Sequence, residues 1–119
     1  MINFSLSKLL DLISLEDVLA AIIFRIDGEV LQIVQKENTQ YNTLFSTVLN
    51  WCKENIKQVS IEMRNNNLAK VTYELNNTTV LFFVINSISI LTIVGVKNAN
   101  LSLLSIEAKR KALSLSSEI

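Results

Sequence analysis

Histidine is absent from this 119-residue chain, and cysteine occurs once, as Cys52. Without histidine the chain lacks the commonest general base and the commonest zinc ligand, and it cannot form a Ser-His or Cys-His pair. A single cysteine excludes a disulfide within the chain and gives no metal-ligand spacing. The composition therefore points to no catalytic residues, no cofactor and no metal site, and we expect Cys52 to be an inert, reduced thiol.

The chain also lacks a net charge, because 11 Lys and Arg residues balance 11 Asp and Glu residues. Aromatic residues make up 7% of the chain, and no basic stretch interleaves with them, so we expect no nucleic-acid partner. Lys8 and Asp11 interrupt the first apolar residues, which argues against a secretory signal. The apolar region 80–96 is too short to cross a bilayer and contains Asn86. These features predict a cytoplasmic protein without stable membrane insertion.

The length corresponds to one domain, residues 1–119, and 50% hydrophobic residues are ample for a core. Apolar periodicity predicts elements in the order α-β-β-α-β-β-β-α. We expect a helix at 5–14, strands at 18–26 and 29–36, a long helix from Tyr41 or Thr43 to about Arg64, strands at 69–75, 79–85 and 88–96, and a last helix capped by Asn98 and fraying after Leu113. Three strands look covered on both faces and two look like edges, which predicts an α/β (α+β) sandwich: a five-stranded antiparallel sheet with helices on both faces.

Two local signals refine this expectation. Asp27-Gly28 joins the first two strand patterns, and this pair favours a two-residue type I′ hairpin turn in which glycine takes a positive φ. Gly95 lies inside the last strand pattern, which indicates a bulge or a close approach of another backbone. The polar residues 37–42 are expected to form a loop after the hairpin.

The end of the long helix is open to two interpretations. Val59, Ile61 and Met63 alternate with polar residues, so an additional strand beginning near Val59 is an alternative. Val59 and Met63 also continue the apolar stripe of the helix, and the asparagines at 65–67 provide a stop. We therefore expect the helix to continue to about Arg64.

The order and local patterns resemble the roadblock/LC7 family, within the longin- and profilin-like group. The matching features are the leading helix SLSKLLDLI, the Asp27-Gly28 hairpin, the long second helix, three further strands, and the run Val96-Lys97-Asn98-Ala99-Asn100-Leu101. The family commonly has an acidic turn followed by Ala-Asn-Leu-Gly at that last run, whereas Asn98 and Ser102 stand in the acidic-turn and glycine positions here. Leu15-Glu16-Asp17 occupies the place of the family's frequent proline. The resemblance covers residues 6–113.

The resemblance implies an adaptor and not an enzyme. Family members are similar in forming homodimers or heterodimers, with the long helices side by side and the third strands meeting edge to edge. Their helix-bearing face commonly scaffolds or regulates Ras-like small GTPases, and other members are dynein light chains. A homodimer, or a heterodimer with another roadblock-type chain, and a Ras-like small GTPase are therefore the implied partners. The alternative from another class is a monomeric longin- or profilin-like module that binds a peptide or small ligand.

The apolar arc of the long helix predicts an interaction face. At 100° per residue it spans about 160°, whereas an ordinary surface helix has an apolar stripe of roughly 100°. Trp51 and Leu44 lie on one flank, and Ile56 and Leu49 lie on the other. An exposed apolar flank with a tryptophan is typical of a partner surface. The alternative is that Trp51 covers the sheet edge as part of the core.

The strand at 69–75 is the second candidate, because an unblocked edge strand invites pairing with another chain. Lys70 and Glu74 could instead protect this edge against pairing. The carboxylates of Glu16-Asp17 and Asp27-Glu29 are expected to be solvated charges, because no pocket is evident around them. The predicted dimer or partner interface consists of Leu44, Val48, Trp51, Cys52, Val59, Met63, Lys70, Val71, Thr72 and Tyr73.

Overall fold

The helices and strands follow the expected order. The computed structural model describes residues 2–36 and 42–117. Its elements are α1 (Ile2–Ile13), β1 (Val18–Arg25), β2 (Val30–Gln35), α2 (Asn42–Asn65), β3 (Lys70–Glu74), β4 (Thr78–Val84), β5 (Ser89–Val96) and α3 (Leu101–Ser116). Residues 37–41 of the expected polar loop lie outside the described residues, and Asn42 already belongs to α2.

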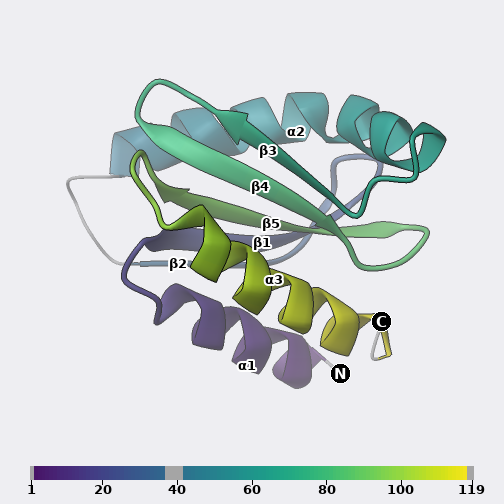
Figure 1. The fold of residues 1–119 in the computed structure, drawn as a ribbon, viewed down its shortest axis with the longest axis horizontal. Coiled ribbons are helices and arrows are strands. Elements are labelled where there is room, and N and C mark those ends of the chain that lie inside the picture. The colour runs from purple at the N-terminus through teal and green to yellow at the C-terminus, as the bar shows by residue number, and fades with distance from the viewer. Residues whose placement is uncertain (1, 37–41, 118–119) are drawn as a thin grey trace.

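The strands form one five-stranded sheet in the order β2-β1-β5-β4-β3, and every neighbouring pair is antiparallel. The predicted antiparallel sheet is thus confirmed. Apolar β1, β4 and β5 are central, and the more mixed β2 and β3 are the two edges. Figure 1 shows α2 on one face of the sheet and α1 with α3 on the other, so both faces are covered.

The core has two parts, one on each face of the sheet. Side chains alternate between the faces of a strand, so each central strand supplies both parts. On the α1 and α3 face, Leu9 and Leu104 pack against Ile23, Leu81 and Ile93. The core on the α2 face contains Val48, Cys52, Ile56, Val59 and Met63 of the helix with Ile22, Phe24, Val80 and Phe82 of the sheet.

The first hairpin closes differently from the expected type I′ turn. The N–H of Gly28 donates to Arg25 O at 2.9 Å, and the N–H of Arg25 donates to Glu29 O at 2.8 Å. Within this turn only Gly28 has a positive φ, +101°, whereas a type I′ turn requires two such residues. The result is a three-residue connection, Ile26-Asp27-Gly28, of the kind closed by a glycine bulge. The prediction of the turn type was wrong because β1 ends at Arg25 and Ile26 enters the turn.

The long helix continues to Asn65, so no additional strand begins at Val59. Its end is marked by Asn67, whose φ of +53° lies in the left-handed region, and by a bond from Leu68 N to Met63 O at 2.8 Å. Such a left-handed residue closes helix C-termini by satisfying their last carbonyls. Met63 is buried and Ile61 is exposed, as the helical phase requires.

The last helix differs from expectation at both ends. Its N-cap is Asn100 and not Asn98, because the Asn100 side chain accepts a hydrogen bond from Leu103 N at 3.1 Å. The N–H of Asn100 in turn donates to the Asp17 carboxylate at 2.8 Å, which fixes the start of the helix. The helix also continues past Leu113 to Ser116, since Leu115 is buried in the core.

Gly95 is a site of close backbone approach, as expected. A Cβ at this position would lie 3.2 Å from Asp17 O and 3.4 Å from the Leu104 side chain. The strand register opposite shifts between Val18 and Ala20. The absence of a side chain at Gly95 therefore lets the start of β1 and the first turn of α3 meet at one corner.

Candidate protein-interaction face

One flank of α2 places a tryptophan beside the edge strand β3. The Trp51 ring lies edge-on to Tyr73 of β3, with ring centroids 5.2 Å apart and an interplanar angle of 68°. Phe82 of β4 completes the group, and its ring centroid lies 6.3 Å from that of Trp51 and 5.9 Å from that of Tyr73. Edge-to-face pairs are a favourable arrangement of aromatic rings. Trp51 and Tyr73 are only half-buried, so this aromatic group is part core and part surface.

The two flanks of α2 differ in how far the protein's own sheet covers them. Ile56 is fully buried against the protein's own sheet, whereas Leu49 is half-buried. On the flank near β3, Leu44 and Trp51 are both half-buried. The apolar arc of α2 is thus wider than the surface that its own sheet covers, and part of each flank is accessible.

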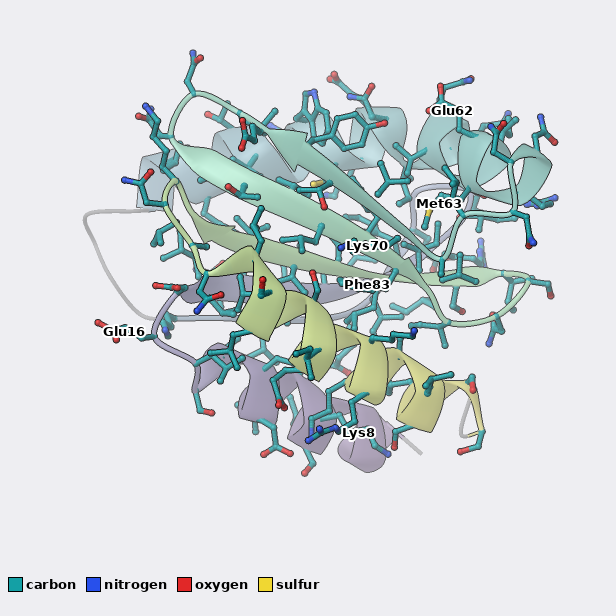
Figure 2. The ribbon with its side chains drawn as sticks, in the orientation of Figure 1. Lys8, Glu16, Glu62, Met63, Lys70 and Phe83 are labelled. Carbon is teal, nitrogen blue, oxygen red and sulfur yellow. The ribbon has the colours of Figure 1, made fainter. Side chains whose placement is uncertain are left out.

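Four residues of the predicted interface lie beneath α2. Val48, Cys52, Val59 and Met63 are each at most 3% exposed and belong to the core on that face. Figure 2 shows the labelled Met63 between α2 and the sheet, while the neighbouring Glu62 projects away from them. These four side chains pack α2 onto the sheet and are not accessible on the surface of the described structure.

The accessible members of the predicted interface are grouped by the fold. Leu44 and Trp51 come from α2, and Lys70, Val71, Thr72 and Tyr73 come from β3. Val71 and Tyr73 are half-buried against the core on the α2 face. Lys70 lies on the opposite face, where its Nζ donates to Ser105 Oγ of α3 at 3.2 Å. The role of this set as an interface stays a prediction.

The electrostatics of this face are mild. Burial raises the pKa of the Tyr73 hydroxyl above its ordinary value, and the nearby Glu62 carboxylate raises it further. Desolvation raises the pKa of the Cys52 thiol to about 12. Because the thiolate is the reactive form of cysteine, Cys52 is chemically inert at neutral pH.

The carboxylates considered in the sequence have structural surroundings. Asp27 is paired with Arg25 at 2.6 Å, and the hydrogen bond from Arg25 holds the pKa of the Asp27 carboxyl below its ordinary value. Glu29 contacts the same guanidinium at 2.6 Å. Asp17 Oδ2 instead accepts the backbone N–H of Asn100, a role that sequence reasoning missed. No local pattern signals that contact, because 83 residues separate its partners.

A cleft that the sequence did not predict lies at the C-terminal end of α2. It has a volume of ≈ 610 Å³, and its walls come from α2, the α2–β3 connection and the β4–β5 turn. Met63, Leu68 and Ile90 line it, together with Arg64 and Ser60. Arg64 donates to Ser60 Oγ at 3.4 Å. The cleft is mainly apolar, with a small polar side formed by the helix end.

Within the described residues, no group of three or more His, Cys, Asp or Glu side chains is placed to hold a metal ion. None of the helices in the part of the chain that the structure describes is long and apolar enough to span a membrane.

The fold is shared with several solved structures. MglC from Myxococcus xanthus superposes with a TM-score of 0.83 at 13% identity, over 95% of this chain and 97% of that one. A structure of MglB with tetrameric arrangement gives a TM-score of 0.68 at 14% identity, over 97% and 87% of the two chains. A roadblock/LC7 domain from Streptomyces avermitilis gives 0.67 at 14% identity, over 94% of each chain. Identities this low show a common fold and no more.

At the level of sequence, no curated protein matches the chain. The model of a family described as AF0774-like protein, however, matches residues 3–109, which is most of the chain. The predicted resemblance in fold is confirmed by the solved structures. The chain therefore belongs to the AF0774-like protein family and has a roadblock/LC7-type fold.

Proposed function

We propose that this protein is a non-catalytic, dimeric adaptor that scaffolds or regulates a Ras-like small GTPase. The observation that carries the proposal is the aromatic group of Trp51 and Tyr73, half-buried beside the edge strand β3. The roadblock/LC7-type fold supports it, because dimeric adaptors of small GTPases are common on that fold.

The edge strand β3 carries backbone groups and apolar side chains that this chain does not fully pair or cover. An edge strand presents a row of backbone N–H and C=O groups that can pair with another chain. Beside that row, Val71, Tyr73 and Trp51 offer apolar surface that their own core covers only in part. A second copy would satisfy the backbone and cover the aromatic group at once, with the same patch on both subunits.

The dimer can be tested by placing charges in the proposed contact. Trp51→Glu and Val71→Arg should each shift the protein from dimer to monomer, because a charge in a desolvated contact is costly. Sedimentation velocity across a micromolar concentration series would measure the shift. Ile61→Glu is the matched control, since Ile61 is an exposed apolar residue on the outer side of α2. A wild-type protein that is monomeric at micromolar concentration would contradict the proposal.

The GTPase needs a separate experiment. The immobilised wild-type chain and the Trp51→Glu variant would be compared for co-purifying small GTPases, identified by mass spectrometry. A captured GTPase would then be purified, recombined with the wild-type chain, and assayed for nucleotide hydrolysis and for binding in its GDP- and GTP-bound forms. We expect direct binding with a preference between the two nucleotide states. If none of the captured Ras-like GTPases, once purified, binds the wild-type chain directly, the partner assignment is contradicted.

The cleft at the end of α2 favours a second candidate, a monomeric module that binds an apolar peptide or small ligand. Its volume of ≈ 610 Å³ is within the usual range for ligand sites. Trp51 is about 18 Å along the helix from Met63, given a rise of 1.5 Å per residue, so its fluorescence is a poor reporter for this site. The Met63 methyl resonance is a direct reporter. A monomer whose Met63 signal shifts on ligand addition, with the Leu104 signals on the other face unchanged, would favour this candidate.

A further inference from the structure

The free edge of β3 has a fixed backbone pattern. In β3–β4 the N–H of Leu75 donates to Thr78 O at 2.8 Å, and the N–H of Val84 donates to Ala69 O at 3.3 Å. Opposed residues of an antiparallel ladder alternate between hydrogen-bonded and non-hydrogen-bonded pairs. The bonded positions on this strand are therefore the odd-numbered ones, 69, 71, 73 and 75. The backbone groups of Lys70, Thr72 and Glu74 point away from β4, toward the free edge.

The side chains of β3 are divided in the same way. Val71 and Tyr73 lie on the α2 face, whereas Lys70 contacts α3 on the other face. Figure 2 shows Lys70 beside its cross-strand partner Phe83 on the side of α3. Because side chains alternate along a strand, Thr72 and Glu74 share that face with Lys70. The outward-pointing backbone groups thus belong to residues with the side-chain order cation, hydroxyl, anion.

We propose that β3 pairs antiparallel with β3 of a second copy in one register, centred on Thr72. In this register each Lys70 lies opposite Glu74 of the other copy, and the two Thr72 residues face each other across the two-fold axis. On the other face each Val71 lies opposite a Tyr73. The inference rests on the proposed dimer and deepens it, because it names the residues that select a second copy as the partner.

Charge complementarity distinguishes this register from its neighbours. Only outward-pointing residues can form the new hydrogen-bonded pairs. The possible registers therefore differ from one another by shifts of two residues along the strand. A register centred on Val71 places Lys70 opposite Thr72, and one centred on Tyr73 places Glu74 opposite Thr72. Centring on Lys70 or Glu74 opposes like charges, which destabilises a strand pair. The Thr72 register uses all three outward residues of each copy and pairs every charge.

The same pattern favours a homodimer over a heterodimer. A strand whose charges run from cation to anion about a central hydroxyl is complementary to itself when it is reversed. An isologous interface needs that property, since every contact occurs twice. Lys70 and Glu74 therefore do not block the edge, as charges on an edge strand can do; they specify which strand it accepts.

Charge reversal tests the pairing. K70E makes both charged edge positions acidic, and E74K makes both basic, so each variant should repel its own copy. We expect the dimer dissociation constant of each to rise about tenfold, from two altered cross-strand pairs per dimer. The double variant K70E/E74K restores opposite charges and should dimerise like the wild type. An equimolar mixture of K70E and E74K should form a heterodimer, which native mass spectrometry can identify.

A disulfide measures the register directly. Hydrogen-bonded antiparallel pairs have Cα atoms about 5.5 Å apart, which is within disulfide reach. T72C should therefore form a covalent dimer on mild oxidation, while the buried Cys52 does not react. K70C is the matched comparison, because the two introduced cysteines would be offset by four residues, about 14 Å along the strands at 3.4 Å per residue. K53E controls for net charge, as Lys53 is an exposed lysine on the side of α2 near the first hairpin.

The outcomes separate this inference from the proposed function. A dimer that is weakened by Trp51→Glu, but does not cross-link through T72C or is insensitive to K70E and E74K, overturns the register and leaves the adaptor proposal standing. Restored dimerisation in K70E/E74K together with T72C cross-linking supports the register whether or not a GTPase binds. A monomeric wild-type protein overturns the register and the dimer together.

Discussion

At the scale of single residues, Cys52 shows how burial decides chemistry. Its position on the apolar arc of α2 predicted an inert thiol, and the structure buries it completely. Desolvation raises the pKa of the thiol from its ordinary value of 9.0 to about 12. The folded protein therefore keeps the proton over a pH range in which the unfolded chain loses it.

This pKa difference has a consequence for alkaline stability. Because the folded-state pKa is raised, the contribution of the neutral thiol is fully present below pH 9 and is lost as the pH rises toward 12. The stability advantage of the wild type over Cys52→Ala should fall by about 1.4 kcal/mol per pH unit in that window. Urea unfolding of both proteins from pH 7 to 11 would measure it, and the comparison cancels the titration of lysines. A difference that does not change with pH would contradict the buried thiol.

Residue identity alone did not reveal which apolar residues of α2 are covered. The helical period placed Ile56 and Trp51 on opposite flanks of one arc, but it did not show how far the sheet covers each flank. The sheet beneath the helix covers Ile56 fully and Trp51 only in part. That difference depends on where the helix axis crosses the strands, which is a tertiary property that periodicity does not contain.

At the scale of elements, the strand and helix patterns were strong enough to predict every element in order. Boundaries depended on contacts distant in sequence. The run from Asn98 to Asn100 offers two possible N-caps, and the hydrogen bond from Asn100 N to Asp17 selects the second. The hairpin is a different case, because the contacts that hold its three-residue turn are local: Arg25 pairs with both Asp27 and Glu29.

The choice of cap can be tested with two neighbouring asparagines. Asn100→Ala removes the acceptor for Leu103 N and should lower the free energy of unfolding by about 1 kcal/mol. Asn98→Ala, at an exposed position two residues earlier, should change it by less than about 0.5 kcal/mol. Thermal and urea unfolding would measure both. Equal losses, or a larger loss at Asn98, would show that the helix begins elsewhere.

At the scale of the whole molecule, the sheet separates two cores that face different surroundings. The α1 and α3 face packs two helices together, held also by an ion pair between Lys111 and Asp11 at 3.0 Å. The α2 face has a single helix over the five strands and leaves apolar flanks accessible. The proposed contact belongs to the second face and to the β3 edge.

A mutation in the core on the α1 and α3 face should therefore lower the stability of the protein without weakening the proposed dimer contact. Leu104→Ala, at a residue that is 1% exposed, should lower the free energy of unfolding by about 2–4 kcal/mol. Its dimer dissociation constant should match that of the wild type under conditions where both are folded, since Leu104 lies on the far side of the sheet from Trp51. Urea unfolding and sedimentation velocity give the two numbers. A dissociation constant that changes with stability would show that the faces are coupled.

The strand order also determines when the sheet can be completed. The first hairpin joins the rest of the sheet only through β5, which is paired along its length with β1 from Val18 to Arg25. During synthesis β1 and β2 emerge early, but their neighbour is the last strand to leave the ribosome. The nascent chain therefore carries the apolar edge of β1 without its native cover until β5 has left the ribosome, and an unpaired apolar strand edge of this kind is prone to aggregation.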